Sequence, residues 1–353
     1  MNAAATTAGA VEIEVKELDR SGTDRWDRFV QTAADATFFH RAGWKPVVEQ
    51  SLGHRCYFLY AERAGTIVGV LPLVHVKSLL FGNSLVSTGF TVGGGPIAAD
   101  AGALAALDAR ALSLADRLDV DYLEYRGGRT QHPDWSQKKE LYVGFKKPID
   151  PDPEKNMLAI PRKQRAMVRK GIKAGLVSTL DSDVDRLHRV YAVSVRNLGT
   201  PVFGKAFFRA LAETFGADLD IVTCTLNGTA VSSVMNFYFR DQVLPYFGGG
   251  TDAARECAGN DFMYWEVMRR AAERGYRLFD FGRSKTGTGA FAFKKNWGFV
   301  PEPLSYEYKL RKLAQVPEVN PLNPKYRLFI AAWKRLPMPI ANLIGPLVAR
   351  DLA

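Results

Sequence analysis

One series of secondary-structure elements is predicted twice along this 353-residue chain. In the second half it consists of strands over 229–239 and 242–248, a loop opened by Gly249-Gly250-Thr251, a helix over 261–275 and a strand over 278–282. In the first half the same order is given by strands over 70–76 and 85–92, the triplet Gly93-Gly94-Gly95, a helix over 102–118 and a strand over 122–125. Gly95 and Gly250 are 155 positions apart, and Glu124 and Asp280 are 156 apart. A repeat of this length indicates two duplicated domains rather than a solenoid.

The composition is that of an ordinary globular protein with room for two hydrophobic cores. Hydrophobic residues make up 47% and charged residues 24% of the chain. The 3 cysteines are far apart and form no CxxC pair, which favours a reducing compartment and argues against a disulfide framework or a zinc site. No signal peptide or run of about 18 apolar residues is evident. We therefore predict a cytoplasmic protein, and the net charge of +10 favours anionic partners.

The stretch from Arg277 to Phe299 carries the most information about function. It is predicted to contain a short strand, a Gly/Thr-rich loop and a short helix with two adjacent lysines. In many α/β folds ligands bind at the carboxyl ends of strands, where such a loop lies. The polar residues of this stretch are Arg283, Ser284, Lys285, Thr286, Lys294 and Lys295. They predict a crevice for an anionic or strongly polar ligand, and no metal-ligand spacing occurs among them.

Longer motifs resemble those of a known group of transferases. A strand pair, a loop, a helix, a strand and the run AFAFKKNWGF before a last strand resemble the core of GNAT-type N-acyltransferases. Two such units in tandem resemble the FemAB group, which joins amino acids to envelope precursors using aminoacyl-tRNA. One branch is similar in the motifs FFHRAGW, TVGGGP, IPRKQRAMVRKG, VRNLGTPVF, DFGRSKTGTGAFAFKKNWGF and NPLNPKYRL. That branch comprises FemAB-related proteins associated with exosortase (PEP-CTERM) and exopolysaccharide loci, which carry a BioF2-like acetyltransferase domain.

The resemblance implies an α/β (α+β) fold of two fused GNAT-like domains, with mixed sheets flanked by helices. We predict a degenerate first domain at 11–150, the GNAT-like acyltransferase domain at 157–312 and a C-terminal tail at 313–353. A proline- and acid-rich linker separates the two domains. The implied reaction is amide formation, in which an amine attacks the carbonyl of a thioester or ester. This reaction needs no metal and no bound redox cofactor.

Three residues are predicted to carry the chemistry. Asp280 alternates with two phenylalanines on its strand, so its side chain points away from theirs. If that face is covered, Asp280 requires a cationic partner, such as Arg283 or a lysine. Asp280 is the candidate general base, with a structural ion pair as the alternative. The resemblance favours Lys294 as the cation that stabilises the oxyanion, against a solvated helix face. Tyr246 is a candidate to protonate the leaving group, against an ordinary core tyrosine.

Other residues are predicted to bind the substrates. Arg283, Ser284 and Lys285 belong to the loop after the strand, and Asn236 and Tyr264 are candidates to line the acyl channel. A helix over 162–173 has a cationic face without any acid, formed by Arg162, Lys163, Arg165, Arg169, Lys170 and Lys173. This face is predicted to bind phosphates of CoA, a tRNA acceptor stem, a nucleotide-linked sugar or lipid headgroups, and the alternative is a solvated helix face. His40 is expected to shape a pocket in the first domain without acting in catalysis.

Two departures from the family patterns leave the donor open. GNAT enzymes that use acyl-CoA usually carry an Arg/Gln-x-x-Gly-x-Gly/Ala loop at a helix start, which binds the pyrophosphate. Here the corresponding place keeps Arg255 and a glycine without that spacing, and Asp261 is expected to repel a phosphate. Arg255 and Asn260 are still candidates to bind the substrate. Fem enzymes that use tRNA often carry a long charged helical hairpin, and none is predicted here. Acyl-CoA or another thioester is the favoured donor, and charged tRNA is the alternative.

The expected acceptor is an amine of the cell envelope. It is an amino sugar, a peptide amine or a long-chain base that gives a ceramide-type lipid, and DNA is not an expected partner. A non-catalytic protein of envelope-polymer assembly is the alternative from another class. In the tail, 326–348 combines apolar residues with Arg327, Lys334 and Arg335, and its prolines exclude a long spanning helix. This segment is predicted either to pack over the second domain or to lie at the inner face of the inner membrane.

Overall fold

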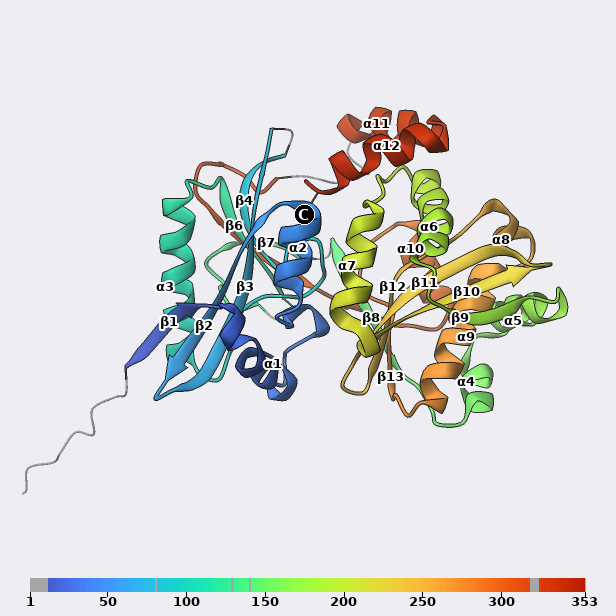
Figure 1. Ribbon diagram of the computed structural model, residues 1–353, viewed down its shortest axis with the longest axis horizontal. Coiled ribbons are helices and arrows are strands. Elements are labelled where there is room, and N and C mark those ends of the chain that lie inside the picture. Colours follow the sequence, from blue (N-terminus) through green and yellow to red (C-terminus); the bar gives the residue numbers. More distant parts are fainter. Residues whose placement is uncertain (1–11, 80, 128–129, 140, 318–323, 353) are drawn as a thin grey trace, which may run out of the picture.

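The computed structural model of the protein has two sheets that lie side by side, each covered by helices (Figure 1). It describes residues 12–79, 81–127, 130–139, 141–317 and 324–352. Among these residues the first sheet has the strand order β1-β2-β3-β4-β6-β16-β7, with β5 on β3. The second has the order β14-β8-β13-β12-β11-β10-β9, with β15 on β8. Two mixed sheets flanked by helices confirm the predicted fold class.

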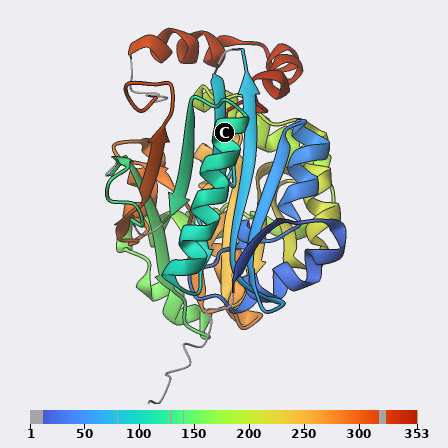
Figure 2. The same ribbon diagram turned by 90° about the vertical axis from the view of Figure 1, so that its left-hand side faces the viewer.

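The first sheet is covered on both faces. Its strands are β1 (Ile13–Glu17), β2 (Arg55–Arg63), β3 (Thr66–Ser78), β4 (Gly82–Ser87), β5 (Ile97–Ala98), β6 (Tyr122–Gly127), β7 (Ser136–Lys138) and β16 (Ser305–Leu310). The covering helices are α1 (Thr23–Thr32), α2 (Trp44–Leu52), α3 (Ala101–Arg117) and the short 3-10 helices η1 (Arg20–Gly22) and η2 (Phe38–His40). Helix α3 lies across the outer face, as Figure 2 shows, and α1 and α2 lie on the other face. Side chains alternate along β2, so Leu59 packs on the α3 side and Phe58 on the opposite side.

The second sheet is also a central layer between helices. Its strands are β8 (Tyr142–Pro148), β9 (Val177–Asp181), β10 (Leu219–Leu226), β11 (Thr229–Phe239), β12 (Gln242–Gly250), β13 (Leu278–Asp280), β14 (Ser284–Lys285) and β15 (Pro301–Pro303). Its helices are α4 (Pro153–Ala159), α5 (Arg162–Lys173), α6 (Val184–Leu198), α7 (Lys205–Phe215), η3 (Gly216–Asp218), α8 (Asp252–Glu256), α9 (Gly259–Glu273) and α10 (Gly289–Asn296). Residues of α9 pack with one face of the sheet and residues of α6 and α7 with the other.

The repeat predicted from the sequence is present in the fold. In the first half β3 pairs antiparallel with β4, α3 follows, and β6 returns parallel to β4. In the second half β11, β12, α9 and β13 have the same order and the same strand directions. The expected loop start at Gly249-Gly250-Thr251 was wrong, because β12 continues through Gly250. A Cβ on Gly249 would lie 2.4 Å from the Cβ of Ser194, so only glycine lets α6 approach the strand this closely.

The two sheets exchange one strand each. Strand β8 pairs with β13 in the second sheet, although it precedes the linker between the halves. Strand β16 pairs with β6 in the first sheet, although it follows the whole second half. The hydrogen bonds therefore do not follow the predicted ranges 11–150 and 157–312 at these two strands, and that division remains a prediction. Each half contributes one strand to the sheet of the other half, which places residues of both halves at the centre of the molecule.

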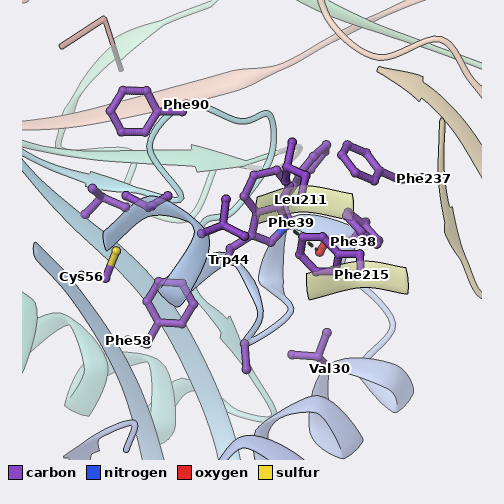
Figure 3. Packing of buried hydrophobic residues seen from close by; sticks show 14 of the residues in the cluster. Val30, Phe38, Phe39, Trp44, Cys56, Phe58, Phe90, Leu211, Phe215 and Phe237 are labelled. Atoms are coloured by element: carbon purple, nitrogen blue, oxygen red, sulfur yellow. Dashed lines mark hydrogen bonds between the residues drawn. The ribbon is translucent and has the colours of Figure 1, made fainter. Parts of the chain in front are cut away.

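An aromatic core joins the halves (Figure 3). Phe237 of β11 is fully buried and stacks on Phe38 of η2, with 4.5 Å between the ring centroids. Its ring also lies 5.9 Å from that of Trp44 of α2 and 6.1 Å from that of Phe215 of α7. Contacts between aromatic side chains from both halves bury a large apolar area. This core fixes the position of the two sheets relative to each other.

The C-terminal segment contains helices α11 (Pro324–Arg335) and α12 (Met338–Ala349), which lie at the upper end of the molecule in Figure 1. Both helices contact α6 of the second half. Among the described residues no helix is long and apolar enough to cross a membrane.

Candidate active site

The pairing between β12 and β13 is interrupted at the centre of the second sheet. The two parallel strands pair only at Gln242 with Leu278 and Val243 with Phe279. Beyond these pairs β12 remains paired only with β11, whereas β13 remains paired only with β8. A register shift between β11 and β12 leaves Tyr246 opposite no residue of β11. Such bulges redirect a side chain and are frequent next to active sites.

A cavity of about 690 Å³ lies between the two halves next to this interruption. The first half contributes η2, the loop before α3 and the end of β6, and the second half contributes β12, β13 and the following loop. Its polar and aromatic lining includes Phe39, His40, Arg126, Gln131, Lys146, Tyr246, Asp280 and Arg283. The structure thus brings three predicted site residues, Tyr246, Asp280 and Arg283, to one cavity.

Asp280 is held in a fixed position at the end of β13. Its Oδ1 accepts a hydrogen bond from the Gly282 backbone N–H at 2.8 Å. Its Oδ2 lies 3.5 Å from Nζ of Lys146, which faces Asp280 across the β8–β13 pairing. The cationic partner is therefore a lysine of the exchanged strand rather than Arg283. Because the carboxylate lines the cavity, one of its oxygens can accept a proton from a bound molecule.

Arg283 lies among aromatic rings and carries an uncompensated charge. Its guanidinium carbon is 4.4 Å from the ring centroid of Tyr142, and its Nη1 donates to the hydroxyl of Tyr306 at 2.7 Å. No carboxylate of the described residues forms an ion pair with it. The nearby Arg126, by contrast, forms an ion pair with Glu124 at 2.7 Å. Arg283 therefore gives this part of the cavity a positive potential.

Lys294 points from α10 toward the end of β13. Its Nζ donates to the backbone oxygens of Arg283 at 3.0 Å and of Gly282 at 3.4 Å. Burial lowers the pKa of Lys294 to about 8. The neighbouring Lys295 is exposed, so only one of the two lysines faces the site. Lys285 lies on β14 and not in a loop as predicted. Burial also lowers the pKa of Lys285 to about 8, and its Nζ lies 5.5 Å from the ring centroid of Tyr142.

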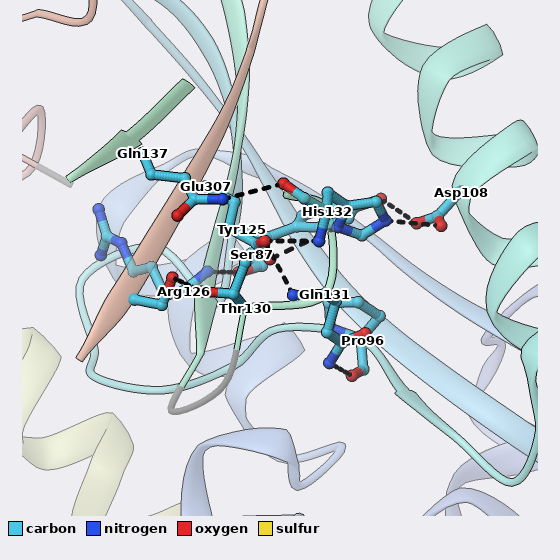
Figure 4. A network of polar contacts seen from close by, with 11 residues as sticks. Ser87, Pro96, Asp108, Tyr125, Arg126, Thr130, Gln131, His132, Gln137 and Glu307 are labelled. Carbon is cyan, nitrogen blue, oxygen red and sulfur yellow. Dashed lines mark hydrogen bonds and ion pairs between the residues drawn. The ribbon is translucent and has the colours of Figure 1, made fainter. Parts of the chain in front are cut away.

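The first-half side of the cavity is held by buried polar contacts. His40 accepts from the Thr37 backbone N–H at 3.0 Å and its Nε2 lies 2.9 Å from the Gly95 oxygen. Burial lowers the pKa of His40 to about 4, so the ring is neutral near pH 7. Figure 4 shows the adjacent network, in which Gln131 N–H donates to Glu307 Oε1 at 2.9 Å. Glu307 belongs to β16, so the exchanged strand supports the cavity loop of the first half.

Residues 160–295 match the sequence profile of the family described as Acetyltransferase (GNAT) domain. This part of the chain is similar to GNAT acetyltransferase domains, and the protein is an acyltransferase. A search of curated proteins found no significant match. The exosortase association suggested by the motifs stays a prediction.

Solved structures share the two-unit fold of this acyltransferase at low sequence identity. A crystal structure of FemX has a TM-score of 0.66 and 14% identity, covering 90% of this chain and all of FemX. A tandem GNAT protein from the clavulanic acid biosynthesis pathway has a TM-score of 0.54 and 15% identity, covering 85% of this chain and 98% of its own. The C-terminal domain of a putative lysylphosphatidylglycerol synthetase from Agrobacterium fabrum has a TM-score of 0.55 and 13% identity. This match covers 82% of this chain and 91% of that domain's chain. These likenesses confirm the tandem GNAT-like architecture.

The predicted cationic face of the GNAT domain lies on α5, away from the cavity. Among the described residues none of its six cations forms an ion pair. A surface hollow of about 590 Å³ is lined by Arg162, Arg165, Ala166, Arg169, Lys170 and Lys173. Val168 on the opposite face is buried, and α5 packs there on α9. The face is thus open to solvent and has the charge expected for a phosphate-binding surface.

Contrary to the prediction, Asp261 at the start of α9 does not face a ligand surface where it could repel a phosphate. Asp261 is buried, and its Oδ1 accepts hydrogen bonds from Gln164 Nε2 and Trp297 Nε1, both at 3.0 Å. It therefore joins α5, α9 and the end of α10 instead of facing a ligand. Arg255 is exposed on α8, and the buried Oδ1 of Asn260 accepts no hydrogen bond from a described residue.

Three further predicted residues lie outside the cavity, and Lys285 and Lys294 are not among the residues that line it either. Asn236 is buried and donates through Nδ2 to Asp220 Oδ1 at 2.8 Å. The Tyr264 ring packs 4.7 Å from that of Phe281, and burial raises the pKa of Tyr264 to about 12. Ser284 is buried on β14, and its hydroxyl makes no hydrogen bond to a described residue. Their binding roles remain predictions.

The sequence interpretation missed the contributions of β8 and β16. Lys146 and Tyr142 of β8 contact Asp280 and Arg283, and Tyr306 of β16 accepts from Arg283. These strands occupy equivalent places at the ends of the two repeats. The repeat is therefore the sequence signal from which the equivalent positions of β8 and β16 could have been predicted.

Proposed function

We propose that the protein is an N-acyltransferase whose acceptor amine binds in the cavity between the two halves. The observation that carries the proposal is the joint lining of this cavity by Asp280, Tyr246 and Arg283 next to the interrupted β12–β13 pairing. A base and a hydroxyl donor, which acyl transfer to an amine can use, face one space together with an anion-binding group. Lys294 approaches the same strand end from α10.

In the proposed reaction the amine nitrogen attacks the acyl carbonyl carbon. The new C–N bond forms, and the bond from that carbon to the sulfur or oxygen of the donor breaks. Asp280 takes the proton that the amine loses. Tyr246 gives its proton to the leaving group, and exchange with solvent restores both residues. The hydroxyl of Tyr246 has no hydrogen-bond partner among the described residues, which leaves it available for this step.

Lys294 supplies positive charge to the oxyanion. Its ammonium group is buried at the strand end, where a charge acts more strongly than in water. The proposal needs its charged form, which is present below a pH of about 8.

The cavity favours an acceptor that carries an anionic group beside its amine. Arg283 has no ion-pair partner among the described residues, and a carboxylate or phosphate would neutralise it while accepting its hydrogen bonds. Amino-sugar phosphates and peptides of the cell envelope satisfy this condition, and a long-chain base satisfies it only when it carries such a group. Arg283 lies three residues after Asp280. An acceptor whose anionic group contacts Arg283 would therefore have its amine near the Asp280 carboxylate.

Acyl-CoA or another thioester is the proposed donor, as is typical of GNAT domains. One observation favours the second candidate, aminoacyl transfer from charged tRNA: the six unpaired cations of α5. A phosphate backbone on this face would give RNA binding with a steep salt dependence. Thioester binding requires far fewer phosphate contacts.

The pH dependence of amide formation tests the role of Lys294. We expect kcat/KM to fall as the pH rises through about 8, because Lys294 then loses its charge. In Lys294→Arg the charge persists, so this fall moves to a higher pH. The matched variant Lys295→Arg, altered on the exposed neighbour, keeps the wild-type profile. An identical fall in wild type and Lys294→Arg contradicts the assigned role.

A further inference from the structure

Large apolar side chains are exposed together at one end of the molecule. On α12 the exposed fractions are 75% for Leu343 and 59% for Leu347, and on α11 Leu328 is 82% exposed. The same end carries exposed Leu79, Leu198, Phe329 and Ile340. An apolar patch gathered from several elements marks an interaction site more often than scattered single residues do.

The contributing segments are far apart in sequence but touch one another. The Ser78 hydroxyl, at the end of β3, donates to Asp351 Oδ2 at 2.8 Å, just after α12. Arg196 of α6 donates to the Lys334 backbone oxygen at 2.9 Å. Figures 1 and 2 both show α11, α12 and the adjoining ends of β3 and β4 at this upper end.

The outward direction of the α12 leucines is fixed by packing on the other face. Ala341, Gly345 and Ala349 are buried against the body of the protein. A Cβ on Gly345 would lie 3.2 Å from backbone atoms of Val202, which shows how closely the helix approaches. A rotation that hid Leu343 and Leu347 would bring larger residues into this contact. Their exposure is therefore a property of the packed helix.

The positive charge at this end of the molecule favours an anionic partner. From 324 to 350 the sequence has no acidic residue, whereas Arg327, Lys334, Arg335 and Arg350 flank the leucines. Among the described residues Arg327, Lys334 and Arg335 form no ion pair. Apolar side chains bordered by arginine and lysine on short helices are typical of segments that lie in a bilayer interface and prefer anionic lipids.

We propose that α11, α12 and Leu79 after β3 bind the surface of an anionic phospholipid bilayer. The leucines would enter the boundary of the acyl chains, and the cations would contact lipid phosphates. No described helix spans a bilayer, so the binding is peripheral. The inference rests on this surface alone and does not depend on the proposed reaction.

Sedimentation with vesicles tests the inference on the full chain. We expect the protein to bind vesicles of phosphatidylglycerol and phosphatidylcholine and to stay unbound with phosphatidylcholine alone. The double variant Leu343→Glu with Leu347→Glu is expected to lose about tenfold or more in vesicle affinity. Lys334→Glu with Arg335→Glu is expected to reduce binding and to make the remainder less sensitive to salt.

The matched control replaces two leucines of comparable exposure away from this end. Leu158 and Leu180 are 62% and 59% exposed on α4 and β9. Leu158→Glu with Leu180→Glu is expected to leave vesicle binding unchanged, with circular dichroism showing that each variant is folded. Equal loss in both double variants, or no binding by the wild type, overturns the proposal. So does a wild-type dimer in solution that the Leu343 and Leu347 changes dissociate, because the partner is then a second copy.

Discussion

Replacing Asp280 by asparagine is expected to lower kcat/KM for amide formation by a factor of about 10² to 10⁴. Asparagine keeps an oxygen that can accept from Gly282 N–H, so the turn after β13 is preserved. It loses the negative charge and the basic oxygen that takes the amine proton. Steady-state kinetics with a saturating donor measure the change.

Lys146→Met separates catalysis from a structural ion pair. This change removes the cation 3.5 Å from Asp280 but leaves the carboxylate in the cavity. If Asp280 acts as the base, Lys146→Met retains activity within about tenfold, because an ion pair whose lysine is exposed to solvent contributes about 1 kcal/mol or less. Equal losses in Asp280→Asn and Lys146→Met, or full activity in Asp280→Asn, would show that the carboxylate has only a structural role.

Phe237→Ala is expected to lower the free energy of unfolding by about 3 to 5 kcal/mol. The ring is fully buried and contacts Phe38, Trp44 and Phe215, so its removal leaves a cavity in the core that joins the halves. Phe38 and Tyr246 also line the proposed acceptor cavity, and both rings touch Phe237. Guanidinium denaturation followed by tryptophan fluorescence gives the loss.

Phe329→Ala is the matched control for this change. Phe329 is 43% exposed on α11, so the same truncation there is expected to cost less than about 1 kcal/mol. A Phe237→Ala loss below that of Phe329→Ala would contradict a core that is shared by both halves.

Local patterns in the sequence predicted the elements of the fold well. Strand β11 has the predicted bounds 229–239, because its apolar alternation and the turn residues on both sides are local signals. The aromatic-lysine run became α10, with Lys294 turned toward the strand end. Asp280 and Arg283 reached the cavity because they flank the end of one strand.

The residues that complete the site depended on contacts that no local pattern reports. Lys146 meets Asp280 only because β8 crosses into the second sheet, and Tyr306 meets Arg283 only because β16 crosses into the first. Asp261 was expected at a ligand surface, yet Gln164 and Trp297 from two other helices enclose it. The strand exchange is decided by pairings over more than a hundred residues, and the contacts of Asp261 join residues 97 and 36 positions apart.

The central claim is that the inter-domain cavity forms amides from an acyl donor and an amine. Its most direct test is mass spectrometry of products after the protein is mixed with an acyl-CoA or charged tRNA and a panel of anionic and neutral amines. We expect a new amide that requires both donor and amine, appears fastest with amines bearing a carboxylate or phosphate, and is lost in Asp280→Asn. Donor consumption without any amide, or equal amide formation by wild type and Asp280→Asn, would contradict the claim.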